Sequence, residues 1–351
     1  MYTKAQVMDV LTKVYEDSRM VMLGEQCGGN REKPARVLER YAKATGGHLP
    51  AVMGIDLACY GLQLPDVGVG SEEWNTTIDQ LADYAEKGGI ITASSHFANP
   101  TGEYGVGGKC RGNFGGAEMW EEMLTEGTEL NRIIKEELII DGKFLKELDD
   151  RGIPVLWRPL HEANGGWFWF CGRSHNEMDW IDPEYLRRFW RYIYNLYVNE
   201  MGIKNLIWVY GPNVSSNAPG GTRDVLYYYP GDEYVDILGV DWYTGGNREL
   251  NSPSGHSYDK IMSRGKLCAI TEFGHGGALR APKGSGVEVQ EKLFNAVDMV
   301  ELIKSYVKQG LKIAYVLTWT GGCGAIYSIG KGEEALADPF CIDLERLKKL
   351  Y

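Results

Sequence analysis

Gly152-Ile-Pro-Val-Leu-Trp-Arg-Pro-Leu-His161-Glu162-Ala-Asn-Gly-Gly-Trp167-Phe-Trp-Phe170 is the stretch from which the fold can be inferred. Residues 153–160 form an apolar run with a single arginine, which indicates a buried parallel strand. The run leads directly into a histidine and a glutamate, then into two glycines and a block of aromatic residues. Glutamate is rarely buried unless it is paired, so an acid here indicates proton chemistry beside a flat ligand. The plainer alternative is an ordinary strand end with a solvated glutamate.

The same arrangement, a short apolar run followed by polar residues, recurs along the chain. It predicts eight strands separated by segments with helical periodicity. The strands cover residues 20–23, 51–55, 89–93, 153–160, 204–209, 234–240, 266–270 and 313–317. Alternating strands and helices in this number predict an α/β fold of the single (β/α)8 TIM barrel type. A doubly wound sheet is the alternative, but it would need no eighth strand to close it.

Amphipathic segments with recognisable ends lie between these strands. Asp182 followed by Pro183 is a helix N-cap with a first-turn proline. Apolar residues at helical spacing predict helices that include residues 78–85, 130–138, 186–197 and 293–307. The sequence contains no linker or low-complexity tract, so residues 1–351 are predicted to form one catalytic domain.

Composition restricts the class of ligand. The 351 residues are 44% hydrophobic and 24% charged, which is typical of a globular protein. The formal net charge is −11 and no basic run occurs, so we expect no nucleic acid, no membrane surface and no polyanionic substrate as partner. Glycine-rich loops and many aromatic residues suit carbohydrate binding, although aromatic residues also fill cores.

Targeting features and cysteines leave the cellular location open. No run approaches the ~18 apolar residues of a membrane span, and no signal peptide follows Met1. Either the protein is cytosolic or a leader has been removed. Seven cysteines cannot all pair within the chain, but one or two bridges are allowed. Cys268 lies within an apolar run and is predicted to be a buried thiol.

A barrel would bring distant acids together. The C-terminal ends of all eight strands meet at one face, where active sites of this fold lie. Glu162 follows the fourth predicted strand and Glu272 follows the seventh. Two carboxylates facing one cleft match the requirement of glycoside hydrolysis. Arg158 is a lone charge within the fourth strand, so we expect cleft carboxylates as its partners and a role in placing Glu272.

Metal-dependent chemistry fits the sequence less well. His161-Glu162 lacks the second histidine of the zinc-protease motif H-E-x-x-H. His96, Asp241 and Glu272 could join these two residues in a metal site on a barrel. The aromatic block beside Glu162 is unusual for such a site, so we expect neither a metal nor a cofactor.

Two aromatic residues at predicted strand ends have alternative interpretations. Trp319 is either a plug of the core or a platform on which a sugar ring stacks. Tyr243 either packs at the rim or donates its hydroxyl to a carboxylate. The glycine-rich segment 102–116 does not open a helix, and we interpret it as a mobile loop beside the cleft.

Three segments together resemble glycoside hydrolase family 26. They are Trp157-Arg-Pro-Leu-His-Glu-Ala-Asn-Gly-Gly-Trp-Phe-Trp169, Ile270-Thr-Glu-Phe-Gly274 and residues 229–241. Weaker similarity at residues 50–56 and 96–100 and at Trp319 extends the resemblance over nearly the whole chain. The family consists largely of β-1,4-mannanases, and its acid/base and nucleophile end barrel strands four and seven. The resemblance therefore implies Glu162 as acid/base and Glu272 as nucleophile.

The resemblance also implies which residues bind substrate. His96 and His161 would contact the sugar on the non-reducing side of the cut. Trp167 and Trp319 would flank the scissile bond, and Tyr243 would bond to the nucleophile. A further aromatic that the family carries in the third-strand loop has no clear counterpart in residues 109–114, where Phe114 is the only candidate.

We therefore predict a retaining endo-β-1,4-mannanase that cleaves mannan, galactomannan or glucomannan with two glutamates. The alternatives are a mannobiose-releasing exo-mannanase, a β-1,3-xylanase or mixed-linkage glucanase of the same family, and an inactive sugar-binding barrel. The expected partner is an uncharged polysaccharide or oligosaccharide. We expect a secreted monomer whose leader is absent from this sequence, and a cytoplasmic location stays open.

Overall fold

A closed barrel of parallel strands forms the centre of the molecule. The computed structural model describes residues 1–27, 33–59, 67–104, 108–171, 180–215, 222–244, 256–275, 299–319 and 332–351. The barrel strands are β1 (Val21–Gln26), β2 (Val52–Asp56), β3 (Ile90–Ser94), β4 (Val155–Arg158), β5 (Leu206–Tyr210), β6 (Ile237–Thr244), β7 (Leu267–His275) and β8 (Tyr315–Trp319). Neighbours pair in chain order, and β1 pairs with both β2 and β8. The predicted (β/α)8 barrel is thus confirmed, and a doubly wound sheet is excluded.

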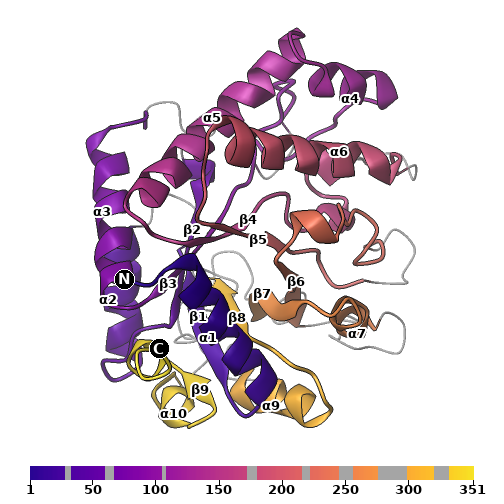
Figure 1. Ribbon diagram of the computed structural model, residues 1–351. Coiled ribbons are helices and arrows are strands. Elements are labelled where there is room, and N and C mark those ends of the chain that lie inside the picture. The colour runs from indigo at the N-terminus through magenta and orange to yellow at the C-terminus, as the bar shows by residue number, and fades with distance from the viewer. Residues whose placement is uncertain are drawn as a thin grey trace, which may run out of the picture.

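Helices surround this barrel (Figure 1). They are α1 (Lys4–Asp17), α2 (Pro34–Ala44), α3 (Glu72–Glu86), α4 (Ala117–Leu124), α5 (Glu129–Asp150), α6 (Pro183–Tyr194), α7 (Ser257–Met262), α9 (Met299–Lys308), α10 (Gly332–Ala337) and α11 (Leu344–Leu347). None of the helices in the described ranges is long and apolar enough to cross a membrane.

The helices predicted from periodicity are present. Residues 78–85 and 130–138 lie within α3 and α5. The Asp182 side chain accepts a hydrogen bond from the backbone of Glu184 and caps α6, as predicted. The predicted continuation to residue 197 is also helical, because α6 leads into a π-helical turn. Of the last predicted helix, the part from Met299 is confirmed as α9, and the earlier part lies outside the described residues.

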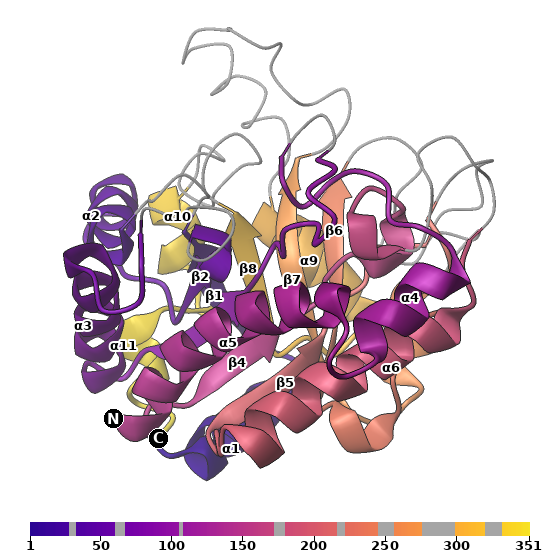
Figure 2. The same cartoon turned by 90° about the horizontal axis from the view of Figure 1, so that it is seen from above.

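One strand was not predicted. β9 (Cys341–Ile342) pairs in parallel with the start of β1, on the outside of the closed ring. Two residues are too short to give a recognisable pattern in the sequence. The two chain ends lie side by side (Figures 1 and 2), and the rings of Tyr2 and Tyr351 stack on each other.

Several strand ends differ from the prediction. β6 and β7 continue past their apolar runs, so Asp241, Tyr243 and Glu272 lie within strands and not after them. The apolar pattern stops early because the barrel interior is polar near the active face. β4 is shorter than predicted, because Pro159 has no N–H to donate and Leu160 has a φ of 50°.

Three cysteines are buried free thiols. Cys268 in β7 is completely buried, as predicted from its apolar surroundings. Cys110 and Cys171 lie in segments that precede and follow β4 and are likewise buried and unpaired. These three cysteines therefore take no part in the one or two disulfide bridges that seven cysteines allow.

Candidate active site

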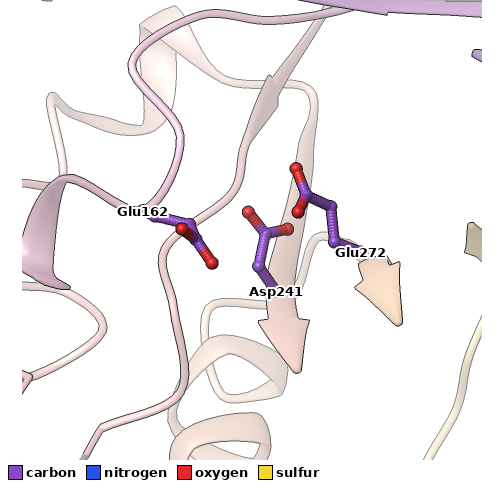
Figure 3. Close-up of side chains that lie close together, drawn as sticks. All are labelled: Glu162, Asp241 and Glu272. Carbon is purple, nitrogen blue, oxygen red and sulfur yellow. The ribbon is translucent and has the colours of Figure 1, made fainter. Parts of the chain in front are cut away.

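Three carboxyl groups meet at the C-terminal end of the barrel. Glu162 lies in the loop after β4, Asp241 lies in β6 and Glu272 lies in β7. One oxygen of each lies within 4.8 Å of the others, and Figure 3 shows the three side chains gathered in one space. All three are buried, with Glu162 the most accessible at 8%. Barrel closure therefore joins acids that are far apart in the sequence.

The backbone before Glu162 has an unusual conformation. Leu160 and Glu162 both have positive φ angles, of 50° and 52°. A left-handed conformation costs a residue other than glycine about 1–3 kcal/mol and is found mostly at functional sites. The Glu162 amide donates to the carbonyl of Gly211 at 2.8 Å, which holds the turn in place. As a result, the side chains of both His161 and Glu162 approach Glu272.

Two hydrogen bonds hold the Glu162 carboxyl group. Asn213 donates from Nδ2 to Oε1 at 2.7 Å, and Trp167 donates from Nε1 to Oε2 at 2.8 Å. Asn213 is itself fixed, because its backbone amide donates to Asn164 Oδ1 at 2.8 Å. Asn164 belongs to the same loop as Glu162. This loop therefore holds Asn213, which lies after β5, and Asn213 in turn orients Glu162.

The surroundings of Glu162 favour its protonated form. Burial and the negative charge of Glu272 raise the pKa of Glu162 to about 7, against the hydrogen bonds from Asn213 and Trp167 and the charge of Arg158. A carboxyl group with this pKa carries a proton in about half of the molecules at neutral pH. Glu162 can therefore act as a general acid under ordinary conditions.

Glu272 has the opposite environment. Arg158 donates from Nη2 to Oε1 at 2.5 Å, and the Tyr243 hydroxyl donates to Oε2 at 2.6 Å. Both oxygens therefore accept strong hydrogen bonds, one of them from a cation, and these bonds hold the carboxyl group in place. The two neighbouring acids thus have different partners, because neutral Asn213 and Trp167 bind Glu162 while Arg158 and Tyr243 bind Glu272.

Arg158 connects Glu272 with Asp241. Its Nη1 donates to Asp241 Oδ2 at 2.7 Å, and the guanidinium is only 1% exposed. Burial lowers the pKa of Arg158, but Asp241 and Glu272 outweigh this effect and raise it overall, so the cation is permanent. Burial raises the pKa of Asp241 well above its usual value, although Arg158 opposes this. The sequence-based expectation that Arg158 contacts cleft carboxylates thus matches the observed contacts.

A bulge in β7 turns two successive side chains inward. Val240 pairs with Ile270 but Asp241 pairs with Glu272, which leaves Thr271 as an extra residue. Thr271 donates its hydroxyl to Asp241 Oδ1 at 2.6 Å, while Glu272 reaches Arg158. In a regular strand these neighbours would point to opposite faces. The bulge therefore brings Glu272 and Thr271, which supports Asp241, into the site from adjacent positions.

Two glycines make room for this network. A Cβ on Gly211 would come within 2.7 Å of Arg158 Cδ, and one on Gly239 within 2.2 Å of Thr271 Cγ2. Either contact is closer than van der Waals packing allows. Glycine at these positions therefore lets the segment just after β5 approach Arg158 and lets β6 approach Thr271.

The imidazole rings of His161 and His96 lie between Glu272 and Asp56. His161 Nε2 lies 3.9 Å from Glu272 Oε1 and 3.1 Å from His96 Nε2. His96 Nδ1 forms an ion pair with Asp56, which ends β2 and is 4% exposed. Asp56 also accepts hydrogen bonds from the backbone of Ala58 at 3.0 Å and of His96 at 3.3 Å. Asp56 therefore fixes the orientation of His96 beside the two acids.

The two histidines differ in charge. Burial lowers the pKa of His96, but the Asp56 carboxylate outweighs this effect and raises it overall. Burial lowers the pKa of His161 well below its usual value, and the positive charges of His96 and Arg158 lower it further. We infer that His96 is the cation and donates its Nε2–H to the neutral ring of His161.

Aromatic rings surround the histidines. The Phe168 ring lies 5.1 Å from that of His96 and 5.3 Å from that of His161, between centroids. Trp319, which is partly exposed at the end of β8, meets His96 edge to face at 5.8 Å. Trp319 is therefore not a fully buried plug of the core, and its position beside His96 suits a sugar platform.

Phe114 does not take part in this surface. It is 5% exposed and packs against Trp120 and Trp169, with centroid distances of 5.1 and 5.0 Å. These contacts place the ring in the core between the third-strand loop and α4. The only candidate for an aromatic sugar contact in residues 109–114 is therefore a structural residue.

The carboxylate cluster is a poor metal site despite its geometry. Three oxygens within 4.8 Å of one another could surround a cation. However, Arg158 already donates to Asp241 and Glu272, and a fixed guanidinium would repel a divalent ion at this distance. The donor set therefore suits chemistry performed by the carboxyl groups themselves.

Two residues of the site were missed by sequence reasoning. Asp56 and Asn213 follow the predicted strands 51–55 and 204–209 but are not among the predicted site residues. Their position was the available indication, because a barrel gathers all such strand ends at one face. Asn213 now binds the candidate acid and Asp56 binds His96.

A (β/α)8 barrel that carries two close glutamates, one with a raised pKa and the other bound by arginine and tyrosine, is typical of glycoside hydrolases. Comparison with known proteins identifies the same class. The sequence model of glycosyl hydrolase family 26 matches residues 1–285. The chain belongs to glycosyl hydrolase family 26, and the resemblance noted in the sequence is thus confirmed.

Individual relatives agree with this assignment. A mannan endo-1,4-beta-mannosidase of Bacillus subtilis is 31% identical over 304 residues, which cover 85% of this chain and 73% of the relative. Another from Bifidobacterium adolescentis is 31% identical over 315 residues, which cover 84% of this chain but only 29% of that much longer protein. The solved structure of a Bacillus subtilis mannanase has a TM-score of 0.74 at 25% identity and covers 97% of this chain and 92% of its own.

Proposed function

We propose that this glycoside hydrolase is a retaining endo-β-1,4-mannanase acting on mannan, galactomannan or glucomannan. The observation that carries the mechanism is the separation of the two glutamates, whose nearest oxygens lie within 4.8 Å. Retaining glycosidases hold their carboxyl groups about 5–5.5 Å apart, whereas inverting ones need about 6.5–9.5 Å to seat a water. The short separation supports direct attack by one carboxylate.

The first step forms a covalent intermediate. Glu272 attacks the anomeric carbon while Glu162 gives its proton to the glycosidic oxygen, so that the carbon–oxygen bond breaks and the leaving sugar departs as an alcohol. Arg158 and Tyr243 hold the Glu272 carboxylate in place for the attack. Trp167 and Asn213 hold the acid beside the leaving oxygen.

The second step releases the sugar. Glu162 removes a proton from a water whose oxygen attacks the anomeric carbon, and Glu272 leaves as a carboxylate. The charge of Glu272 contributes to the raised pKa of Glu162, and esterification removes that charge. The pKa of Glu162 therefore falls when the intermediate forms, which suits its change from acid to base.

The choice of mannan rests on similarity and charge. The curated relatives from Bacillus subtilis and Bifidobacterium adolescentis are both described as mannan endo-1,4-beta-mannosidases. The chain has a net charge of −11, which favours an uncharged polysaccharide over an acidic one. The partly exposed Trp167 and Trp319 provide apolar surfaces for a sugar ring, and the partly exposed His96 with the buried His161 provides a polar one.

Product sizing tests this function. We expect galactomannan to be cut into oligosaccharides of mixed length, with a fast fall in viscosity, and β-1,3-xylan and lichenan to be left nearly intact. Mannobiose as the single product would indicate exo action, and cleavage of only xylan or lichenan would assign a different substrate. The Glu272→Gln variant, prepared in parallel, measures contaminating activity. If no polysaccharide yields a product, the remaining interpretation is an inactive sugar-binding barrel.

A further inference from the structure

The guanidinium of Arg111 contacts an aromatic ring beside the active site. Arg111 lies in the segment between β3 and α4 and is half-buried. Its guanidinium carbon is 5.6 Å from the centre of the Phe168 ring, which is a cation–π distance. Its backbone N–H donates to the carbonyl of Gly108 at 3.1 Å, whereas within the described residues its guanidinium N–H groups form neither a hydrogen bond nor an ion pair. A cation–π contact thus positions the guanidinium, and among the described residues its donors stay available to a ligand.

The Phe168 ring connects Arg111 to the reaction centre. One step further along, this ring contacts His96 and His161, and His161 lies 3.9 Å from Glu272. The sugar attacked by Glu272 lies on the glycone side of the cut, because the leaving group departs next to Glu162. His161 and Phe168 lie successively further from Glu272. We therefore expect the glycone part of the substrate to lie along these residues.

Phe114 and Lys109, which lie in the same segment between β3 and α4, do not serve this purpose. The Phe114 ring is buried in the core. Lys109 extends toward Tyr104, whose ring centre is 5.7 Å from its Nζ and whose side chain is 46% exposed. In this loop the Phe168 ring thus contacts a guanidinium. The family resemblance had implied an aromatic side chain there.

We propose that Arg111 binds hydroxyl oxygens of a glycone sugar that lies beyond the one attacked by Glu272. A guanidinium has five donors and no acceptor, and sugar hydroxyl oxygens are suitable acceptors. The cation–π contact with Phe168 restrains the guanidinium before substrate arrives, which reduces the entropy lost on binding. The inference rests on the proposed function, since it requires a β-linked sugar chain in this cleft.

Aryl β-mannosides with one to four sugar units provide the test. The aryl group occupies the leaving-group position, so every added sugar extends the glycone side. We expect kcat/KM of the unaltered enzyme to rise with chain length. Arg111→Ala should match it on the single-sugar substrate and fall about 10-fold behind on the longer ones, as loss of a charge-assisted hydrogen bond predicts. Arg111→Lys should lie between the two, because it keeps the charge but loses the planar fork.

Lys109→Ala is the matched control, since it removes a cation from the same loop. It should follow the unaltered enzyme at every chain length, and thermal melting shows whether each variant is folded. An equal loss for Arg111→Ala at all lengths would make Arg111 a structural residue. Equal behaviour of Arg111→Ala and Lys109→Ala would remove it from substrate binding. Either result overturns the proposal.

The proposed function can fail separately. If the unaltered enzyme does not cleave aryl mannosides but cleaves the glucoside or xyloside series, mannan is the wrong substrate. The dependence of the Arg111→Ala effect on chain length is then read in the series that is cleaved. A length-dependent loss there supports the role of Arg111, and a uniform loss or none contradicts it.

Discussion

Glu162→Ala is expected to lower kcat/KM on mannan by about 10²–10⁴-fold, the usual contribution of a general acid. The first step on an aryl mannoside with an acidic phenol should change little, because that phenol leaves without a proton. The second step should be slow on both substrates, because the base that activates water is missing. Rapid-mixing experiments on the aryl mannoside should therefore show a burst of phenol followed by slow turnover.

Glu162→Gln is the matched control for this variant. It keeps the shape of the side chain and one oxygen that can accept from Asn213 or Trp167, but it cannot transfer a proton. We expect the same dependence on the leaving group as for Glu162→Ala. Equal loss of the first step on mannan and on the aryl mannoside would remove Glu162 from the role of acid.

The pH dependence follows from the same residue. Burial and Glu272 raise the pKa of Glu162 to about 7, and the acid works only while it is protonated. The protonated fraction is high below this pH and falls as the pH rises through it. On mannan, kcat/KM should therefore decline above about pH 7, and Glu162→Ala should lack this decline on the aryl mannoside. A rate on mannan that rises steadily into the alkaline range would indicate another acid or a hydroxide nucleophile.

Glu272→Ala should cause the larger loss, of at least ~10⁴-fold on every substrate, because no other group forms the covalent bond. A better leaving group should not restore the rate. Arg158 keeps Asp241 as a partner, so we expect the variant to fold, and thermal melting checks this. Added azide should restore cleavage of an aryl mannoside, since its nitrogen bonds to the anomeric carbon as the phenolate leaves.

The configuration of the azide product separates the two roles. In Glu272→Ala a single displacement should give the α-mannosyl azide. In Glu162→Ala azide should instead attack the glycosyl-enzyme and give the β-mannosyl azide after two displacements. A β product from Glu272→Ala, or full activity without azide, would contradict Glu272 as nucleophile.

The barrel could be predicted from the sequence because its strands are buried on both sides. Each strand is then a short apolar run, and a helical period follows it. The acids could be placed because Glu162 and Glu272 come directly after such runs. Because a barrel of eight parallel strands gathers all C-terminal strand ends at one face, both residues could be predicted to lie at that face.

The polar interior of the barrel limited this approach. β6 and β7 extend through Asp241 and Glu272, where charged side chains face inward and interrupt the apolar pattern. The bulge at Thr271 and the left-handed backbone of Glu162 depend on pairing with distant segments. Local sequence contains no information about such pairing, so these features could not be predicted.

The contacts by which one side chain positions another could not be predicted from the sequence either. The ion pair of Asp56 with His96 and the cation–π contact of Arg111 with Phe168 join segments that are far apart in the sequence. Asp56 and Arg111 look like ordinary polar residues when the sequence is read alone. Their roles emerge only from distances, which also show that Phe114 is part of the core.

The configuration of the first product released by the unaltered enzyme tests the central claim most directly. Two glutamates whose oxygens lie within 4.8 Å leave no room for a water between Glu272 and the sugar. Proton NMR of a mannan oligosaccharide during cleavage, recorded before mutarotation, should show the β-anomer first. Appearance of the α-anomer first would show inversion and would contradict both the double displacement and the assignment of Glu272 as nucleophile.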